Sequence, residues 1–330
     1  MDSLLQVDQL STHFRTPRGL VKAVDGVDLR LRKGEILGIV GESGSGKSVM
    51  AQSLLRVVPK SNLAHSDGRV LFDGTDLMHL NEEGMRRVRG ARIAMVTQNP
   101  STSLNPVLTV GAQLMETLRF HPDRSPDQSR FKERMLAMMH EVQLPNPAAI
   151  AQRYPFQLSG GMKQRISIAM ALLCEPEILI ADEPTTALDV TIQAQILDLI
   201  RSLRQAHGTS VIFITHDLGV VAQLCDSVAV MYGGKVIEYN TASEVFRHPR
   251  HPYTQGLLQS NPIFGNTRSR LHAMPGQPPD LAALGPGCAF APRCSQAQQS
   301  CLTTSPSATL LDGHFRHLCP VAETQGAASA

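Results

Sequence analysis

A glycine-rich run from Gly41 to Ser48 (GESGSGKS) is the first segment of the sequence that could carry chemistry. It fills every fixed position of the pattern G-x-x-x-x-G-K-[ST], in which backbone N–H groups surround phosphate oxygens. The apolar run Ile36–Val40 precedes it and a helical pattern over residues 48–57 follows, which is the context that the motif requires. Lys47 would neutralise the β- and γ-phosphates, and the Ser48 hydroxyl would bind Mg²⁺. The run therefore predicts a nucleoside triphosphate site with these contacts: Gly41, Ser43, Gly44, Ser45, Gly46, Lys47 and Ser48.

Two adjacent carboxylates, Asp182 and Glu183, end a second apolar run, Ile178–Ala181. Side chains alternate along a strand, so the two acids need not share a role. Asp182 is placed to bind Mg²⁺, directly or through water, and Glu183 is then available to polarise the attacking water as a general base. Together with the glycine-rich run, these acids predict hydrolysis or phosphoryl transfer. They do not choose between a kinase, a GTPase and a mechanical ATPase.

Four of the 6 cysteines are concentrated near the end of the chain: Cys288, Cys294, Cys301 and Cys319. Such a group can enclose a zinc ion or an iron–sulfur cluster, and in a reducing compartment it is more typical of metal binding than of disulfides. The sequence lacks the paired C-x-x-C knuckles of structural zinc, and Pro320 follows Cys319, which favours a [4Fe–4S] cluster over zinc. Four thiols without a ligand are the remaining alternative. His314 and His317 could replace a ligand, but we expect both to be solvated.

Short apolar runs that alternate with helical patterns must position these residues. Continuous apolar runs are typical of strands buried on both faces, and this chain has five: Ile36–Val40, Ile93–Val96, Ile178–Ala181, Val211–Ile214 and Val228–Met231. Between them, Ile192, Ile196 and Leu203 mark the apolar face of a helix. The alternation predicts an α/β fold with a mostly parallel sheet and helices on both faces. Gly233-Gly234 predicts a tight hairpin after the last run.

The composition of the sequence changes at about Thr241, because the prolines beyond this point would interrupt any long helix or strand. We therefore expect two parts, residues 1–240 and a loop-rich extension over 241–330 with little core of its own, for which a metal would act as a staple. The 31 Lys and Arg residues balance 29 Asp and Glu, so no basic excess points to nucleic acid. No run of 18 apolar residues occurs. The first ten residues contain the acid Asp2 and no basic region of the kind that opens a secretory signal, so we expect a cytoplasmic protein.

The segment Leu158–Arg165 (LSGGMKQR) resembles the LSGG signature of ATP-binding-cassette (ABC) ATPases, with Met162 where many members carry Gln. Ser159 is a good N-cap, and the glycines leave backbone N–H groups open, so this is a second anion-binding helix start. One nucleotide needs only one such loop. The resemblance implies that two cassettes meet head to tail, so that the nucleotide of the partner is contacted by Ser159, Gly160, Gly161 and Met162.

Other landmarks of this family follow in order. Gln98 resembles the Q-loop glutamine, which contacts Mg²⁺ together with Ser48 and Asp182 and senses the transport partner. The segment from Ala187 to Asp189 resembles the D-loop, and His216 resembles the switch histidine that contacts the γ-phosphate. Phe14 resembles the aromatic residue that stacks on adenine. The resemblance implies a nucleotide-binding domain with a mostly parallel core sheet, an antiparallel β subdomain and a helical signature subdomain at about 99–165.

A narrower resemblance links the chain to importer ATPases for dipeptides, oligopeptides and nickel. It is carried by Asn99–Pro106, Ala181–Leu197 and His251–Thr254. Within that group, Gly46–Val49 and Leu158–Met162 are similar to the D-type subunit. It implies a heterodimer with an F-type ATPase subunit beneath two permeases, an extracytoplasmic binding protein, and a [4Fe–4S] cluster on the four cysteines. The site would be the cytoplasmic face of the inner membrane. Uptake of nickel, opines or glutathione, a soluble non-transport cassette and a small-molecule kinase are the alternatives.

Overall fold

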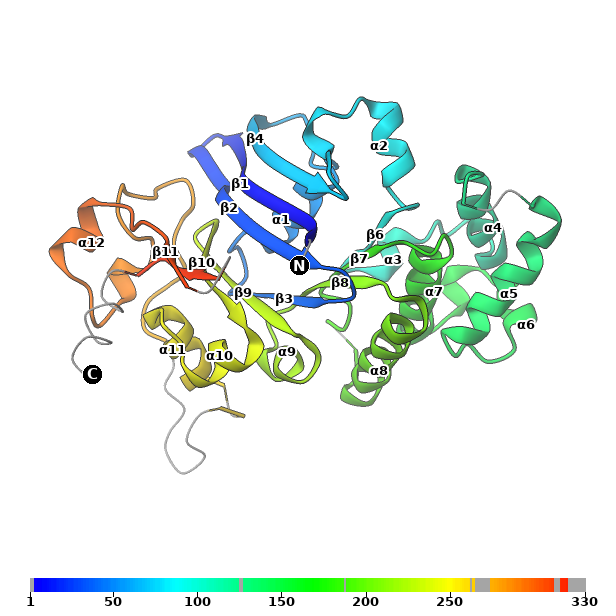
Figure 1. The fold of residues 1–330 in the computed structure, drawn as a ribbon. Helices are drawn as coiled ribbons and strands as arrows, with labels where there is room; N and C mark the ends of the chain where they lie inside the picture. The colour runs from blue at the N-terminus through cyan, green and yellow to red at the C-terminus, as the bar shows by residue number, and fades with distance from the viewer. Residues whose placement is uncertain are drawn as a thin grey trace. The chain divides into compact units, whose positions relative to one another are not determined.

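The computed structural model describes residues 3–124, 127–186, 188–261, 263–264, 274–311 and 315–319. The chain divides into two compact units, one made of residues 1–79 and 215–330 and the other of residues 80–214 (Figure 1). Within the described ranges, no helix is long and apolar enough to cross a membrane. The expected boundary at residue 240 stays a prediction.

The first unit contains an antiparallel sheet, the subdomain that the resemblance implied (Figure 1). Its strands are β1 (Ser3–Thr16), β2 (Gly19–Arg32), β4 (Leu63–Phe72) and β5 (Thr75–Asp76), followed by the turn η1 (Leu77–His79). The spatial order is β2-β1-β4-β5, and β1 pairs with both β2 and β4. Leu5, Val7 and Leu10 on β1 are buried, so this sheet keeps one apolar face against the unit's core.

A second set of strands in this unit carries two of the five predicted apolar runs. It consists of β3 (Ile36–Val40), β9 (Ser227–Tyr232), β10 (Lys235–Thr241), β11 (Thr309–Leu310) and β12 (Arg316–His317). β3 and β9 are parallel and wholly buried, as continuous apolar runs predict. β10, β12 and β11 add antiparallel pairs, so the fold is α/β with mixed sheets. Gly233 and Gly234 form the predicted turn before β10, at φ 59° and 79°.

The helices of this unit are short. They are α1 (Lys47–Leu54), α9 (Leu218–Leu224), α10 (Ala242–Arg247), α11 (Pro252–Gln259), the turn η4 (Ala291–Arg293) and α12 (Gln299–Thr303). The extension is loop-rich, as predicted, but β12 pairs with β10 and so continues the sheet. The expectation that His317 is solvated was wrong, because this pairing leaves it 3% exposed. His314 and Pro320 lie outside the described residues.

The second unit combines parallel strands with most of the long helices. The strands are β8 (Ser210–Ile214), β7 (Ile178–Asp182) and β6 (Ile93–Val96), in that order, and each is one of the predicted runs. The helical elements are α2 (Glu82–Val88), α3 (Pro100–Ser103), α4 (Val110–Phe120), η2 (Gln128–Arg130), α5 (Phe131–Glu141), α6 (Pro147–Ala151), η3 (Pro155–Gln157), α7 (Gly160–Leu172) and α8 (Val190–His207). α8 buries Ile196 and Leu203 on its predicted apolar face, and Gly208, with φ 66°, is its C-cap.

Candidate functional site

The glycine-rich run forms the loop between β3 and α1 in the first unit, as predicted, and we call Gly41–Ser48 the P-loop. Gly41 and Gly46 have φ values of 153° and 103°. A Cβ on Gly41 would lie 2.2 Å from the Met231 carbonyl oxygen, and one on Gly46 would lie 2.1 Å from the Ala23 carbonyl oxygen. Only glycine fits at these positions, because the loop is in close contact with the backbone of β9 and β2.

Lys47 is buried and lies over the P-loop. Its Nζ donates to the carbonyl oxygens of Gly41 and Glu42, at 2.8 and 2.9 Å. These are ordinary charge-assisted bonds to the loop's own backbone. The ammonium group is therefore already positioned at the loop, where the oxygens of a bound phosphate would replace the carbonyl oxygens as acceptors.

His216 and Phe14, the other predicted nucleotide contacts of this unit, follow from neighbouring strands. The Thr215 backbone N–H donates to the Ile39 carbonyl oxygen at 3.1 Å, which places exposed His216 beside the end of β3, where the P-loop begins. Phe14 on β1 is half-buried and pairs with Val21 on β2, near the Ala23 carbonyl that contacts Gly46. Their roles at the γ-phosphate and at adenine stay predictions.

The predicted acids and Gln98 lie in the second unit, where the structure joins two of them. Gln98 Nε2 donates to Glu183 Oε2 at 2.8 Å. Thr186 Oγ1 donates to the same oxygen at 2.9 Å. Sequence reasoning missed Thr186, although its place three residues after the acid is a usable signal. Buried Asp182 ends β7 directly before them.

The signature and the D-loop also lie in the second unit. Ser159 caps α7 as predicted, because its Oγ accepts from the Met162 N–H at 3.4 Å. Asp189 occupies the N-cap position of α8 and is exposed. A Cβ on Gly160 would lie 3.8 Å from the Leu188 side chain, so the two segments are neighbours. Ala187 lies outside the described residues.

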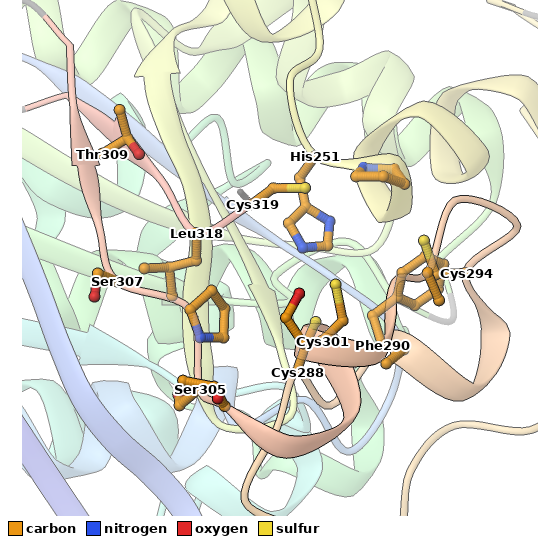
Figure 2. Close-up of a pocket in the computed structure, with 16 residues that line it drawn as sticks. His251, Cys288, Phe290, Cys294, Cys301, Ser305, Ser307, Thr309, Leu318 and Cys319 are labelled. Atoms are coloured by element: carbon orange, nitrogen blue, oxygen red, sulfur yellow. The ribbon is translucent and has the colours of Figure 1, made fainter. Parts of the chain in front are cut away.

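The four cysteines line one cavity of about 340 Å³ in the extension, which we call the cysteine pocket (Figure 2). The Cys288 N–H donates to the Cys301 carbonyl oxygen at 2.7 Å, and Cys301 and Cys319 are buried together. Burial raises the pKa of the Cys288 and Cys294 thiols. Among the described residues, no group of three or more His, Cys, Asp or Glu side chains converges closely enough to hold one metal ion. The predicted ligands thus share a pocket without meeting at a point.

His251 also lines the cysteine pocket, together with the apolar ring of Phe290 (Figure 2). Its burial lowers its pKa to about 3, so the imidazole is neutral at physiological pH. Its Nδ1 accepts from the Tyr253 N–H at 3.0 Å, which makes it the N-cap of α11. The histidine of the segment His251–Thr254 therefore has a structural role at the wall of the pocket.

Residues 24–186 match the family described as ABC transporter, and residues 237–301 match the family described as oligopeptide/dipeptide transporter, C-terminal region. The chain is 50% identical over 310 residues to the dipeptide transport ATP-binding protein DppD of Bacillus subtilis (strain 168), over 94% of this chain and 92% of the relative. The chain belongs to the ABC transporter ATPases.

Other relatives of this ABC ATPase agree with that result. The chain is 45% identical over 316 residues to the probable D,D-dipeptide transport ATP-binding protein DdpD of Escherichia coli (strain K12), over 96% of each chain. The dimeric structure of a post-hydrolysis state of the ATP-binding cassette MJ0796, bound to ADP and Pi, matches with a TM-score of 0.63 and 27% identity. That match covers 72% of this chain and 98% of the other. The cassette fold is thus shared with a solved ABC protein.

Proposed function

We propose that this ABC ATPase is the ATP-hydrolysing subunit of an importer of di- or oligopeptides. The observation that carries the proposal is the match of residues 237–301 to the oligopeptide/dipeptide transporter C-terminal region, since this part of the chain lies beyond the match to the general cassette. The relatives DppD and DdpD bear names of dipeptide transport. The subunit would act at the cytoplasmic face of the inner membrane, beneath two permeases. An extracytoplasmic binding protein would deliver the peptide to these permeases.

Hydrolysis would proceed by attack of water on the γ-phosphate. Glu183 would polarise that water, and the hydrogen bonds from Gln98 and Thr186 orient its carboxylate for this task. Lys47 and His216 would stabilise the charge that develops on the phosphate oxygens. Binding and release of the nucleotide would then drive the permeases between their two access states.

Magnesium fits the oxygen donors of the predicted set. Ser48, Asp182 and Gln98 offer hydroxyl, carboxylate and amide oxygens, which are the hard ligands that Mg²⁺ prefers. The ion would supply charge neutralisation for the β- and γ-phosphates when it binds with ATP.

Replacement of the general base tests this function. The Glu183→Gln variant should bind Mg-ATP with unchanged affinity but hydrolyse it at least about 100-fold more slowly, because an amide cannot accept the proton of the water. Phosphate release, ATP titration and uptake of a labelled dipeptide into cells are the measurements. Glu83→Gln is the matched control, since Glu83 is an exposed acid on α2. Undiminished hydrolysis would show that Glu183 is not the general base. Uptake of nickel without uptake of peptide would contradict the assignment of peptides as the transported substrate.

We further propose that the working unit is a heterodimer with an F-type ATPase subunit. Support comes from the signature, whose glycines lie at the accessible start of α7, away from the P-loop in the sequence. One chain has one P-loop and one signature, so head-to-tail pairing would give each nucleotide both contacts. The segments Asn99–Pro106 and His251–Thr254 carry the resemblance to the group in which D-type and F-type subunits pair.

We also propose that the cysteine pocket holds a [4Fe–4S] cluster. The pocket of about 340 Å³ is bounded by Cys288, Cys294, Cys301 and Cys319. A single zinc ion needs its ligands around one point, whereas a cluster binds each thiolate at a different iron. The absence of C-x-x-C knuckles and the Pro320 that follows Cys319 favour the cluster over zinc. The raised thiol pKa values favour neutral thiols in this conformation, and a bound cation would reverse that preference. When bound, the cluster would cross-link the segments of the extension.

Metal analysis tests the cluster. Protein purified without oxygen should be brown and contain about four irons per chain. Cys294→Ala should lower the iron content, while Cys174→Ala, in a buried cysteine of the second unit, should leave it unchanged. Chelation should increase proteolysis of the extension more than that of the cassette. Zinc without iron would replace the cluster by a zinc site, and a metal-free protein would contradict both.

A further inference from the structure

Arg293 in η4 joins the cysteine pocket to the P-loop. Its Nη1 and Nη2 donate to the two carboxylate oxygens of Glu42, at 2.8 and 3.0 Å. Glu42 is the residue after the first glycine of the P-loop. The Arg293 side chain is 7% exposed and the Glu42 side chain 24% exposed, so water screens the pair little. A bidentate pair of this kind fixes geometry as well as supplying energy.

The guanidinium group of Arg293 is held from several directions. Its Nε donates to the Pro275 carbonyl oxygen at 2.8 Å, and its Nη1 also donates to Tyr232 Oη at 3.1 Å. The group lies 5.8 Å from the centre of the Tyr232 ring and 5.9 Å from that of Phe290, within the range of cation–π attraction. Since these contacts fix the arginine, the ion pair transmits the position of the extension to Glu42.

The backbone of Glu42 is held by the same part of the chain. Its N–H donates at 2.9 Å to the hydroxyl of Tyr253, which is fully buried on α11. The Tyr253 ring lies 4.4 Å from Tyr232 and 5.4 Å from Phe290, centre to centre. The carbonyl oxygen of Glu42 accepts from Lys47 Nζ. Glu42, which the extension binds through both backbone and side chain, therefore also helps to position Lys47.

We propose that Arg293 is a positioning residue for ATP binding, which acts through Glu42 to keep the P-loop in the conformation that receives the phosphates. The proposal deepens the proposed function and rests on it only for the role of the P-loop in ATP turnover. Arg293 directly precedes Cys294, and η4 lies between the pocket cysteines Cys288 and Cys294. The part of the chain that sets this family branch apart thereby contributes to the nucleotide site of the cassette.

A second ion pair of the same kind provides the matched control. Arg316 on β12 pairs with the carboxylate of Asp28 on β2 and also donates to the Asp28 carbonyl oxygen at 3.1 Å. The two side chains are 11% and 23% exposed, close to the values of the first pair. This pair also anchors the extension to the first unit, but Asp28 lies outside the P-loop. Loss of either pair should weaken the anchoring, and only loss of Arg293 should alter ATP binding.

The experiment compares Arg293→Met with Arg316→Met in the full chain. We expect Arg293→Met to raise the Kd for Mg-ATP about ten-fold, measured by titration calorimetry, and to raise the KM of the assembled ATPase alike with kcat within about two-fold. Arg316→Met should leave both constants within about two-fold of wild type. Arg293→Lys, which keeps the charge but loses the bidentate geometry, should fall between. Calorimetry measures ATP binding without transport. A failure of the peptide-import proposal can therefore be distinguished from a failure of this one.

The Glu42→Gln variant tests the same ion pair by changing its partner in the P-loop. Glu42→Gln should raise the Kd for Mg-ATP several-fold. The double variant with Arg293→Met should bind Mg-ATP no more weakly than Arg293→Met alone, because both substitutions remove the same interaction. This variant preserves the test if Arg293→Met does not fold. An unchanged Kd in Glu42→Gln or in folded Arg293→Met would overturn the proposal. So would an equal rise in Arg316→Met, since the effect would then be general anchoring of the extension.

Discussion

Two helices of the protein begin on glycine-rich turns, α1 at the P-loop and α7 at the signature, and they are fixed in different ways. Gly46 at the start of α1 has no side chain that could cap the helix, and the loop is fixed by contact with the backbone at Ala23 and Met231. Ser159 caps α7 with its own hydroxyl. The P-loop thus receives its shape from distant parts of its unit, whereas the signature is a locally capped helix start. Under the proposed function, the first would enclose a phosphate alone, and the second would offer one side of a site.

The largest expected effect comes from the contact that shapes the P-loop. Gly46→Ala should lower the free energy of unfolding by about 3 kcal/mol or more and abolish ATP binding, since its Cβ would lie 2.1 Å from the Ala23 carbonyl oxygen. Gly44→Ala is the control, because Gly44 also has a positive φ, 81°, but a Cβ there meets nothing within 4 Å. It should cost about 1 kcal/mol. Urea unfolding and ATP titration are the measurements, and equal losses in both variants would break the comparison.

A smaller effect is expected at the signature. Ser159→Ala should lower the free energy of unfolding by about 1 kcal/mol through loss of the cap. It should leave the chain's own affinity for ATP unchanged but reduce turnover of the pair with the F-type subunit, because the signature would serve the partner's nucleotide. The control is Thr109→Ala, which removes the cap of α4, where Oγ1 accepts from the Ala112 N–H at 3.3 Å. If Thr109→Ala slows turnover equally, the effect is a matter of helix stability, and the signature role is lost.

The elements of the cassette could be predicted because their signals are local. All five apolar runs became strands, and the glycine pair before Lys235 became the expected turn. The extension was harder to predict. Its β12 has only two residues, too few to show an alternating pattern, so its pairing with β10 and the burial of His317 had no local signal.

Contacts between distant parts of the sequence were also beyond prediction from patterns. Arg293 and Glu42 are 251 positions apart, and neither residue is unusual in its own segment. The types and spacing of the four cysteines predicted a metal site. The structure places them around one pocket, but no metal-binding group forms among the described residues, because spacing does not fix the directions of the thiols. The contact between Gln98 and Glu183 needed the parallel pairing of β6 and β7, which brings the ends of the two strands to one edge.

The backbone at Glu183 has a consequence for engineering. Glu183 has φ 47°, a left-handed conformation that costs a residue other than glycine about 1 kcal/mol. Glu183→Gly would relieve this strain while removing the carboxylate that Gln98 and Thr186 orient. The loss of those two hydrogen bonds would offset the relieved strain, so the variant would gain little stability while losing the proposed general base. The cassette accepts a less stable backbone at the residue where its chemistry is proposed to occur, a trade-off between stability and activity at one peptide unit.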